Sequence, residues 1–232
     1  MHLKRAVSSA RKLKRQGLTA GQTYDRLIEA ILSGALPSGV VVREARLARD
    51  WKTSRTPLRE AMRRAAESGF IVLRPNRAPI VRAMTAHDIR DLYELREVLE
   101  LHALHRSWPH LSQKAIEPVA LLAEQAKPGA ATDWPRRCLK FDLALHGLWM
   151  LRCGNSWLVA DLERHYRFLR IFQRWIGRDS EHLEQSYFQH IAILEAIQNQ
   201  DKTKASELLS THIKRAAQMV ERNLPATPSP TR

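Results

Sequence analysis

The sequence of 232 residues holds only two cysteines, Cys138 and Cys153, and few prolines and glycines. Two cysteines that do not form a CxxC pair cannot build a disulfide framework, so we expect reduced thiols and a cytoplasmic protein. Eleven prolines and nine glycines leave most of the chain free to form helices. No apolar run has the length of a transmembrane helix and no secretory signal follows Met1, so we expect no membrane association.

Acidic residues are scarce in the first third of the chain, where basic residues are abundant. Residues 1–84 hold 18 Lys/Arg against 6 Asp/Glu, a net charge of +12, whereas residues 85–232 hold 20 against 18, a net charge of +2. This distribution indicates a polyanionic partner for the first part, and nucleic acid is the partner we expect. Residues 1–20 contain no acid and predict a flexible basic arm, which either touches phosphates or remains a solvated tail.

Three helices with a tight turn between the second and the third are expected after this arm. Apolar residues recur at helical spacing over residues 23–33 and stop at Gly34. A short strand over residues 40–42 and a second helix over residues 44–51 should follow. The third helix comes directly after a turn at residues 52–53. This order of elements is that of a helix-turn-helix.

The third helix, in the segment TSRTPLREAM at residues 53–62, has one apolar face and one basic face. Ser54 is its expected N-cap. Arg55 and Arg59 lie four residues apart and share a face with Thr56. Arginine can make two hydrogen bonds to guanine O6 and N7, and threonine can contact phosphate or the thymine methyl group. We predict that this helix enters the major groove of DNA, although an ordinary arginine-rich surface helix has a similar pattern.

Two short β-branched segments, FIVLR and PIVRA, flank the sequence PNRA and predict a β-hairpin. Residues 24–81 thereby resemble the winged-helix domain of the GntR family of bacterial transcription regulators, whose hallmark is similar to SRTPLREAM. The resemblance implies DNA contacts from Ser54, Arg55, Thr56, Arg59, Asn76 and Arg77. The chain departs from the family at Ala78 and at Lys52, where glycine is usual. We expect Lys52 either to strain the turn or to add a phosphate contact.

Residues 85–224 predict a second, all-helical domain. Six helices are expected, separated by proline, glycine or asparagine, at residues 86–107, 112–126, 133–152, 155–176, 179–199 and 201–223. The proline-rich residues 225–232 should be disordered. The predicted fold is therefore mainly α, with a winged helix-turn-helix domain at residues 21–84, consisting of three helices and a hairpin wing, before a six-helix bundle.

Four polar residues interrupt the apolar faces of three of these helices. Asp142 and His146 lie four residues apart in one helix, and His190 and His212 lie in two others. Buried polar groups need partners. A single histidine on an apolar face is usually a hydrogen-bonded core residue, whereas one divalent cation could bind all four side chains. Spacing alone leaves both interpretations open.

The helical region resembles the FCD effector-binding domain of the FadR-type branch of the GntR family. The matching segments are REVLE at residues 96–100, FDLALHGL with Asn155 following, QHIAILEAI and STHIKRA. In metal-binding members of the family, the positions that match Asp142, His146, His190 and His212 are the ligands. The resemblance thus implies one divalent metal ion per chain, which could be Zn, Ni, Mn or Fe, and a small carboxylate effector.

Three residues are candidates for contact with that effector. Arg96 lies on the apolar face of its helix and needs an anionic partner. Its partner is either a protein carboxylate such as Glu100 or, as the resemblance implies, the carboxylate of the effector. His165 lies near an apolar stripe and is a candidate for the pocket wall. Asn155 is assigned to the effector site by the resemblance.

These features predict a ligand-responsive transcriptional repressor rather than an enzyme. We expect a homodimer that binds a palindromic operator in double-stranded DNA, with the helical domain supplying the dimer contacts and the switch. A metal-dependent hydrolase with an appended nucleic-acid-binding domain is the alternative, because a cation held by three histidines and an aspartate can activate water. We find no general base beside the ligands, however. A nonspecific nucleic-acid binder is a third interpretation, which the groove-reading helix disfavours.

Overall fold

A computed structural model describes residues 18–82, 85–129, 132–176 and 180–224, without the side chains of residues 167, 168 and 170–176 and of residue 180. Most of the predicted basic arm and all of the predicted disordered tail lie outside the described residues. The chain divides between residues 83 and 84 into two compact units, each with its own interior. No helix in the described part of the chain is long and apolar enough to cross a membrane.

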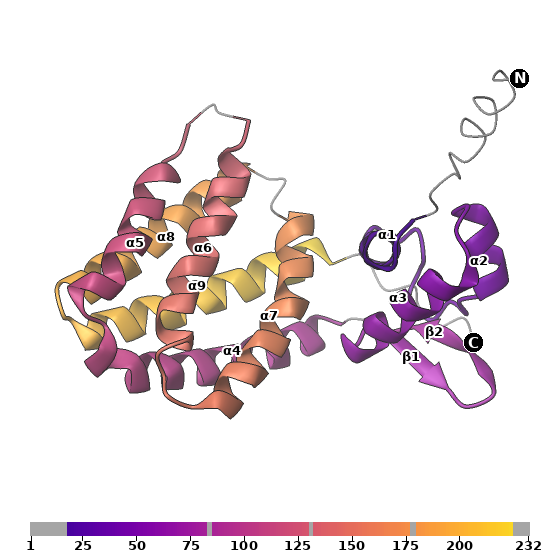
Figure 1. The fold of residues 1–232 in the computed structure, drawn as a ribbon, viewed down its shortest axis with the longest axis horizontal. Coiled ribbons are helices and arrows are strands. Elements are labelled where there is room, and N and C mark those ends of the chain that lie inside the picture. Colours follow the sequence, from indigo (N-terminus) through magenta and orange to yellow (C-terminus); the bar gives the residue numbers. More distant parts are fainter. Residues whose placement is uncertain (1–17, 83–84, 130–131, 177–179, 225–232) are drawn as a thin grey trace, which may run out of the picture. The chain divides into compact units, whose positions relative to one another are not determined.

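The described residues of the first unit form three helices and a β-hairpin (Figure 1). Its elements are α1 (Ala20–Leu32), α2 (Glu44–Asp50), α3 (Arg55–Glu67), β1 (Ile71–Arg74) and β2 (Arg77–Val81). The two strands pair antiparallel, with Ile71 opposite Val81. The winged helix-turn-helix predicted from the sequence is confirmed. The strand expected at residues 40–42 is reduced to a single bridge between Val41 and Ile80, with backbone hydrogen bonds from Val42 N–H to Pro79 O and from Val81 N–H to Val40 O on either side.

The helix α1 begins three residues before the predicted start because Thr19 forms a capping box with Gln22. The Thr19 hydroxyl accepts a hydrogen bond from the Gln22 backbone N–H, and the Gln22 side chain accepts one from the Thr19 N–H. The apolar face of α1 packs on α3, where Leu27 and Leu58 are fully buried. Gly69, at φ +76°, ends α3 and turns the chain into the hairpin.

The second unit is all helical, as predicted. Its elements are α4 (Ala86–Ser107), a 3-10 turn η1 (Trp108–His110), α5 (Gln113–Gln125), α6 (Trp134–Met150), α7 (Ser156–Ile176), α8 (Ser180–Gln198) and α9 (Lys202–Asn223). Thr85 caps α4 in a second capping box, with Asp88. Helix α9 packs along both α4 and α8, and α6 packs on α4, α5 and α8. This packing directs one face of α4, α6, α8 and α9 toward a shared interior (Figure 1).

Candidate DNA-binding surface and metal centre

Helix α3 buries its apolar face and exposes the residues predicted to contact DNA. Arg55, Thr56 and Ser54 are exposed at the N-terminal end of the helix. Ser54 occupies the N-cap position, as predicted, but its side chain makes no capping hydrogen bond. The free backbone N–H groups and the positive end of the helix dipole at this position favour a phosphate.

Arg59 is exposed on the same helix and is joined to α2 by an ion pair. Its Nε donates to Oε2 of Glu44 at 2.8 Å. An ion pair at an exposed position contributes little to stability. Its effect here is geometric, because it holds the arginine stem while the two terminal nitrogens make no hydrogen bond with the described residues. These two nitrogens are the donors that an arginine uses to hydrogen-bond with O6 and N7 of guanine.

The turn before α3 and the tip of the hairpin both require left-handed backbone. Lys52 has φ +54° in the turn, where a side chain with a Cβ is strained by about 1–2 kcal/mol. The structure thus supports the expected strain at this departure from the family. Asn76 has φ +55° at the hairpin tip, a conformation that asparagine tolerates well. Arg77 is exposed beside it.

The second unit brings together the four residues predicted to bind a metal. Asp142 and His146 come from α6, His190 from α8 and His212 from α9, and all four side chains are buried. The Nε2 atom of His190 lies 3.1 Å from Nε2 of His212 and 3.4 Å from Nε2 of His146. The same atom lies 3.4 Å from Oδ1 of Asp142, which is 3.9 Å from Nε2 of His146.

These spacings fit the ligands of a single divalent ion. Ligand atoms at 2.0–2.2 Å from one ion lie about 3–3.5 Å from one another. Helical packing supplies this arrangement, because the four residues come from α6, α8 and α9, and α8 packs on both of the other helices. Without a cation, three imidazole nitrogens and a carboxylate oxygen would be crowded in a buried volume. The residues present therefore fit the predicted metal site.

Two of the three histidines are held in the tautomer that a metal ligand needs. The Nδ1 atom of His146 is 2.5 Å from Oε2 of Glu100, and Nδ1 of His212 is 2.9 Å from the side-chain oxygen of Gln189. Because a carboxylate or amide oxygen can only accept, each Nδ1 carries the proton and each Nε2 keeps its lone pair. Such outer partners orient metal-binding histidines and increase their basicity.

Burial also disfavours the protonated, charged forms of His190 and His212. Burial lowers the pKa of His190 to about 4, although the negative charge of Asp142 acts in the opposite direction. Burial also lowers the pKa of His212 well below its ordinary value, helped by the neighbouring histidines. Both side chains are therefore neutral near pH 7, which is the form that binds a metal.

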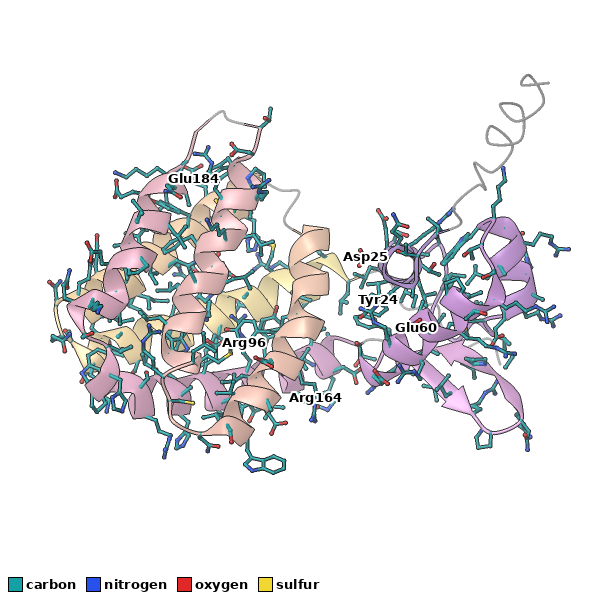
Figure 2. All side chains as sticks on the ribbon, viewed as in Figure 1. Tyr24, Asp25, Glu60, Arg96, Arg164 and Glu184 are labelled. Atoms are coloured by element: carbon teal, nitrogen blue, oxygen red, sulfur yellow. The ribbon has the colours of Figure 1, made fainter. Side chains whose placement is uncertain are left out.

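Arg96 is buried in the middle of the second unit (Figure 2). Its Nε donates to Oε1 of Glu100 at 2.6 Å, and one of its terminal nitrogens lies 3.4 Å from Nε2 of His146. Burial opposes the positive charge of Arg96, but the charge of Glu100 outweighs burial and raises the pKa of the guanidinium. The sequence left either a protein carboxylate or an effector carboxylate as the partner of Arg96, and the structure shows the protein carboxylate of Glu100.

From the sequence, Glu100 was considered only as a possible partner of Arg96, and its contact with His146 was not predicted. Besides Arg96 and His146, it accepts from Trp149 Nε1 at 3.3 Å. Burial would raise the pKa of this carboxyl, but His146 and Arg96 hold it well below its usual range. Its position in the segment REVLE, four residues after Arg96, was the only available signal for this role.

A cavity of about 860 Å³ extends from Asp142, His190 and His212 between α4, α6, α8 and α9. Arg96, Asp142, His190 and His212 all line it. Its volume is that of a pocket for a small organic ligand. Neither Asn155 nor His165 belongs to the lining that the described residues provide.

The structure gives Asn155 and His165 other surroundings. The Asn155 side-chain oxygen accepts hydrogen bonds from the backbone N–H groups of Trp157 and Leu158, at the start of α7. His165 is buried in α7, and its Nε2 has no hydrogen-bond partner among the described residues. Burial, with the charge of Arg96, lowers the pKa of His165 to about 4. Of the three expected effector contacts, only Arg96 reaches the cavity.

Both units match known protein families. The family described as "Bacterial regulatory proteins, gntR family" matches residues 19–81, and the FCD domain matches residues 91–215. The chain is 31% identical over 178 residues to the Nta operon transcriptional regulator of Aminobacter aminovorans, covering 76% of this chain and 82% of that protein. It is 33% identical over 76 residues to the gluconate operon transcriptional repressor of Bacillus licheniformis, covering 33% of this chain and 31% of that protein.

The fold is also that of a solved regulator. The structure of Lar, described as controlling expression of the agr system of Listeria monocytogenes, superimposes with a TM-score of 0.62 and 17% sequence identity. The match covers 88% of this chain and 97% of that chain. At this identity the likeness concerns the fold, and it includes both units.

Proposed function

This chain belongs to the GntR family of bacterial regulatory proteins, in the branch with an FCD domain, and we propose that it is a repressor controlled by a metal-bound carboxylate effector. The family and the relatives are transcription regulators, so the protein is a transcription regulator and not an enzyme. The hydrolase alternative is thereby set aside. Repression is the direction that the name of the Bacillus licheniformis relative supports.

For DNA binding, we propose that α3 enters the major groove and that the hairpin follows the adjacent backbone. Arg55 and Arg59 would read base edges, with Thr56 beside them, because these side chains are exposed while Leu58 of the same helix is buried. Ser54 and Lys52 would contact phosphates at the N-terminal end of the helix. Asn76 and Arg77 would donate from the hairpin tip to phosphate or the minor groove.

For the effector site, we propose that Asp142, His146, His190 and His212 hold one divalent cation. Zn, Ni, Mn and Fe all suit three imidazoles and a carboxylate. The convergence of three Nε2 atoms, two of them fixed in the metal-binding tautomer, is the observation that carries this proposal. When bound, the cation supplies a Lewis acid for an anionic oxygen of the effector.

Arg96 would bind the carboxylate of that effector from the cavity wall. The Nε atom of Arg96 donates to Glu100, whereas one terminal nitrogen lies near Nε2 of His146, and Arg96 lines the cavity. A guanidinium already neutralised by Glu100 costs less to keep buried, and charge-assisted hydrogen bonds from it to a carboxylate are strong. Asp142 lies within the same cavity, so metal and guanidinium act on one small molecule.

We also propose a cytoplasmic homodimer joined through the second unit, which binds a palindromic operator. A two-fold pair of α3 helices would match two half-sites of DNA. An effector that prefers one dimer geometry would change DNA affinity, whereas an effector that binds both geometries equally would change nothing. Light scattering on the full chain at micromolar concentration tests the assembly, and a monomer would contradict it.

The function is tested by measuring operator binding with the metal present and absent. Operator sequences selected from random DNA would be labelled, and their release by small carboxylic acids followed by fluorescence anisotropy. We expect release by at least one acid from the metal-loaded protein, and no release after chelation or in the double variant His190→Ala, His212→Ala. The exposed His110→Ala is the matched control. Equal release with and without metal would contradict the proposal.

A further inference from the structure

The cavity continues well beyond the four metal-binding residues. Along α8 its lining runs from His190 back to His182, and along α9 it runs from His212 forward to Arg222. A rise of 1.5 Å per residue makes these walls about 12–15 Å long. The cavity therefore has room for a molecule that is anchored at the metal and extends along α9.

The wall of this extension is cationic. Arg136, Arg215 and Arg222 line the cavity in addition to Arg96, and Asp142 is the sole carboxylate among the described lining residues. None of the three additional arginines makes an ion pair with a described residue. Lys214, the neighbour of Arg215 in the sequence, is paired instead, because its Nζ lies 3.0 Å from Oε1 of Glu97.

Arg215 is the closest of the three to the metal-binding residues along its helix. It follows His212 by three positions, so the two side chains leave the same face of α9 with Cβ atoms about 5–6 Å apart. No acidic residue stands three or four positions from Arg215 in α9. Arg215 is exposed and has no ion-pair partner among the described residues, so an anion held between it and a divalent cation would be attracted by both charges.

Gln189 adds a neutral donor to the same wall. Its side-chain oxygen is occupied by Nδ1 of His212, which turns its amide nitrogen toward other partners. That nitrogen makes no hydrogen bond with the described residues, and Gln189 lines the cavity. A carboxylate beside Arg215 could accept from both side chains.

We infer that Arg215, assisted by Gln189, forms a second anion-binding subsite and that the effector carries two acid groups. The inference rests on the proposed function, because the first acid group is the one bound by the metal and Arg96. The second group would lie about one helical turn along α9. A ligand with only one acid group would gain nothing from the charge of Arg215.

The test compares diacids with molecules of the same length that carry one charge. Succinate, glutarate and adipate would be titrated into the metal-loaded full chain, beside their monomethyl esters, by isothermal calorimetry. The variants are Arg215→Gln and, as matched control, Lys214→Gln, which removes the same charge one position away at a residue outside the cavity lining. Metal content would be measured after each titration.

We expect at least one diacid to bind about tenfold more tightly than its monoester. This ratio should fall to about two in Arg215→Gln and persist in Lys214→Gln. An unchanged ratio in Arg215→Gln, or no preference for any diacid, overturns the second subsite. Monoester binding that is insensitive to chelation instead contradicts the proposed metal site, and failure of all six acids to bind overturns the effector class and this inference together.

Discussion

Glu100 Oε2 lies 2.5 Å from Nδ1 of His146, a residue 46 positions away on another helix. The other oxygen of the same carboxylate accepts from Nε of Arg96 at 2.6 Å. A single buried anion thus orients a proposed metal ligand and neutralises the guanidinium that lines the cavity. We expect the metal and the effector carboxylate to influence each other through this residue.

The variant Glu100→Gln should weaken metal binding about 10–100-fold, because the amide cannot neutralise Arg96 and accepts from fewer donors than the carboxylate. Competition with a metal-sensitive chelating dye measures this affinity. Glu97→Gln is the matched control, since Glu97 lies on the same helix but pairs with Lys214. Unchanged metal affinity in Glu100→Gln would show that His146 is oriented without this carboxylate. Circular dichroism at the assay temperature separates this effect from loss of folding.

The variants Arg55→Ala and Arg59→Ala should each cost about 1–3 kcal/mol of operator binding and relax the preference for particular bases. The reason is the loss of hydrogen bonds to base edges by α3. Arg63→Ala removes the same charge one turn further along the helix, at an exposed residue paired with Glu67, and should leave the base preference intact. Binding to a panel of operator variants gives the preference. If Arg59→Ala kept the same preference, α3 would not be the reading helix.

The variant Lys52→Gly should be more stable than Lys52→Ala by about 1 kcal/mol, because only glycine adopts φ +54° without strain. Both variants lose the same charge, so the comparison isolates the backbone. The first transition in urea unfolding, followed by circular dichroism, measures the difference. Equal stability of the two variants would mean that this turn relaxes at little cost. Both should bind all DNA sequences more weakly if Lys52 contacts a phosphate.

The variant His165→Phe should reduce the loss of stability in weak acid. The pKa of His165 is lowered to about 4 in the folded protein, against about 6.5 in an unfolded chain. The unfolded state therefore binds the proton first, and this contribution to stability is present above pH 6.5 and is lost as the pH falls toward 4. Between pH 7 and pH 5 the loss amounts to roughly 2 kcal/mol. Urea unfolding at both pH values measures it, with the exposed His110→Gln as control. The same acid sensitivity in His165→Phe would show that this histidine is protonated in the folded state.

Features that depend on neighbours in the sequence were predicted from the sequence. The helices of both units followed from apolar periodicity and from breaks at proline, glycine and asparagine, and Ser54 occupies its expected cap position. The convergence of Asp142 with the three histidines was predicted from their inward faces together with the family resemblance. Such local patterns predict the structure correctly because tertiary packing buries the same apolar faces that the periodicity defines.

Features that depend on packing between distant helices were decided by the tertiary structure alone. The sequence could not show that Glu100 reaches His146, that Glu44 pairs with Arg59, or that Arg215 lines the same cavity as His190 and His212. It assigned Asn155 and His165 to the effector site, whereas the first caps α7 and the second is buried away from the described cavity lining. Periodicity specifies which face of a helix is buried, but the rotation and spacing of the packed helices determine which buried side chains meet.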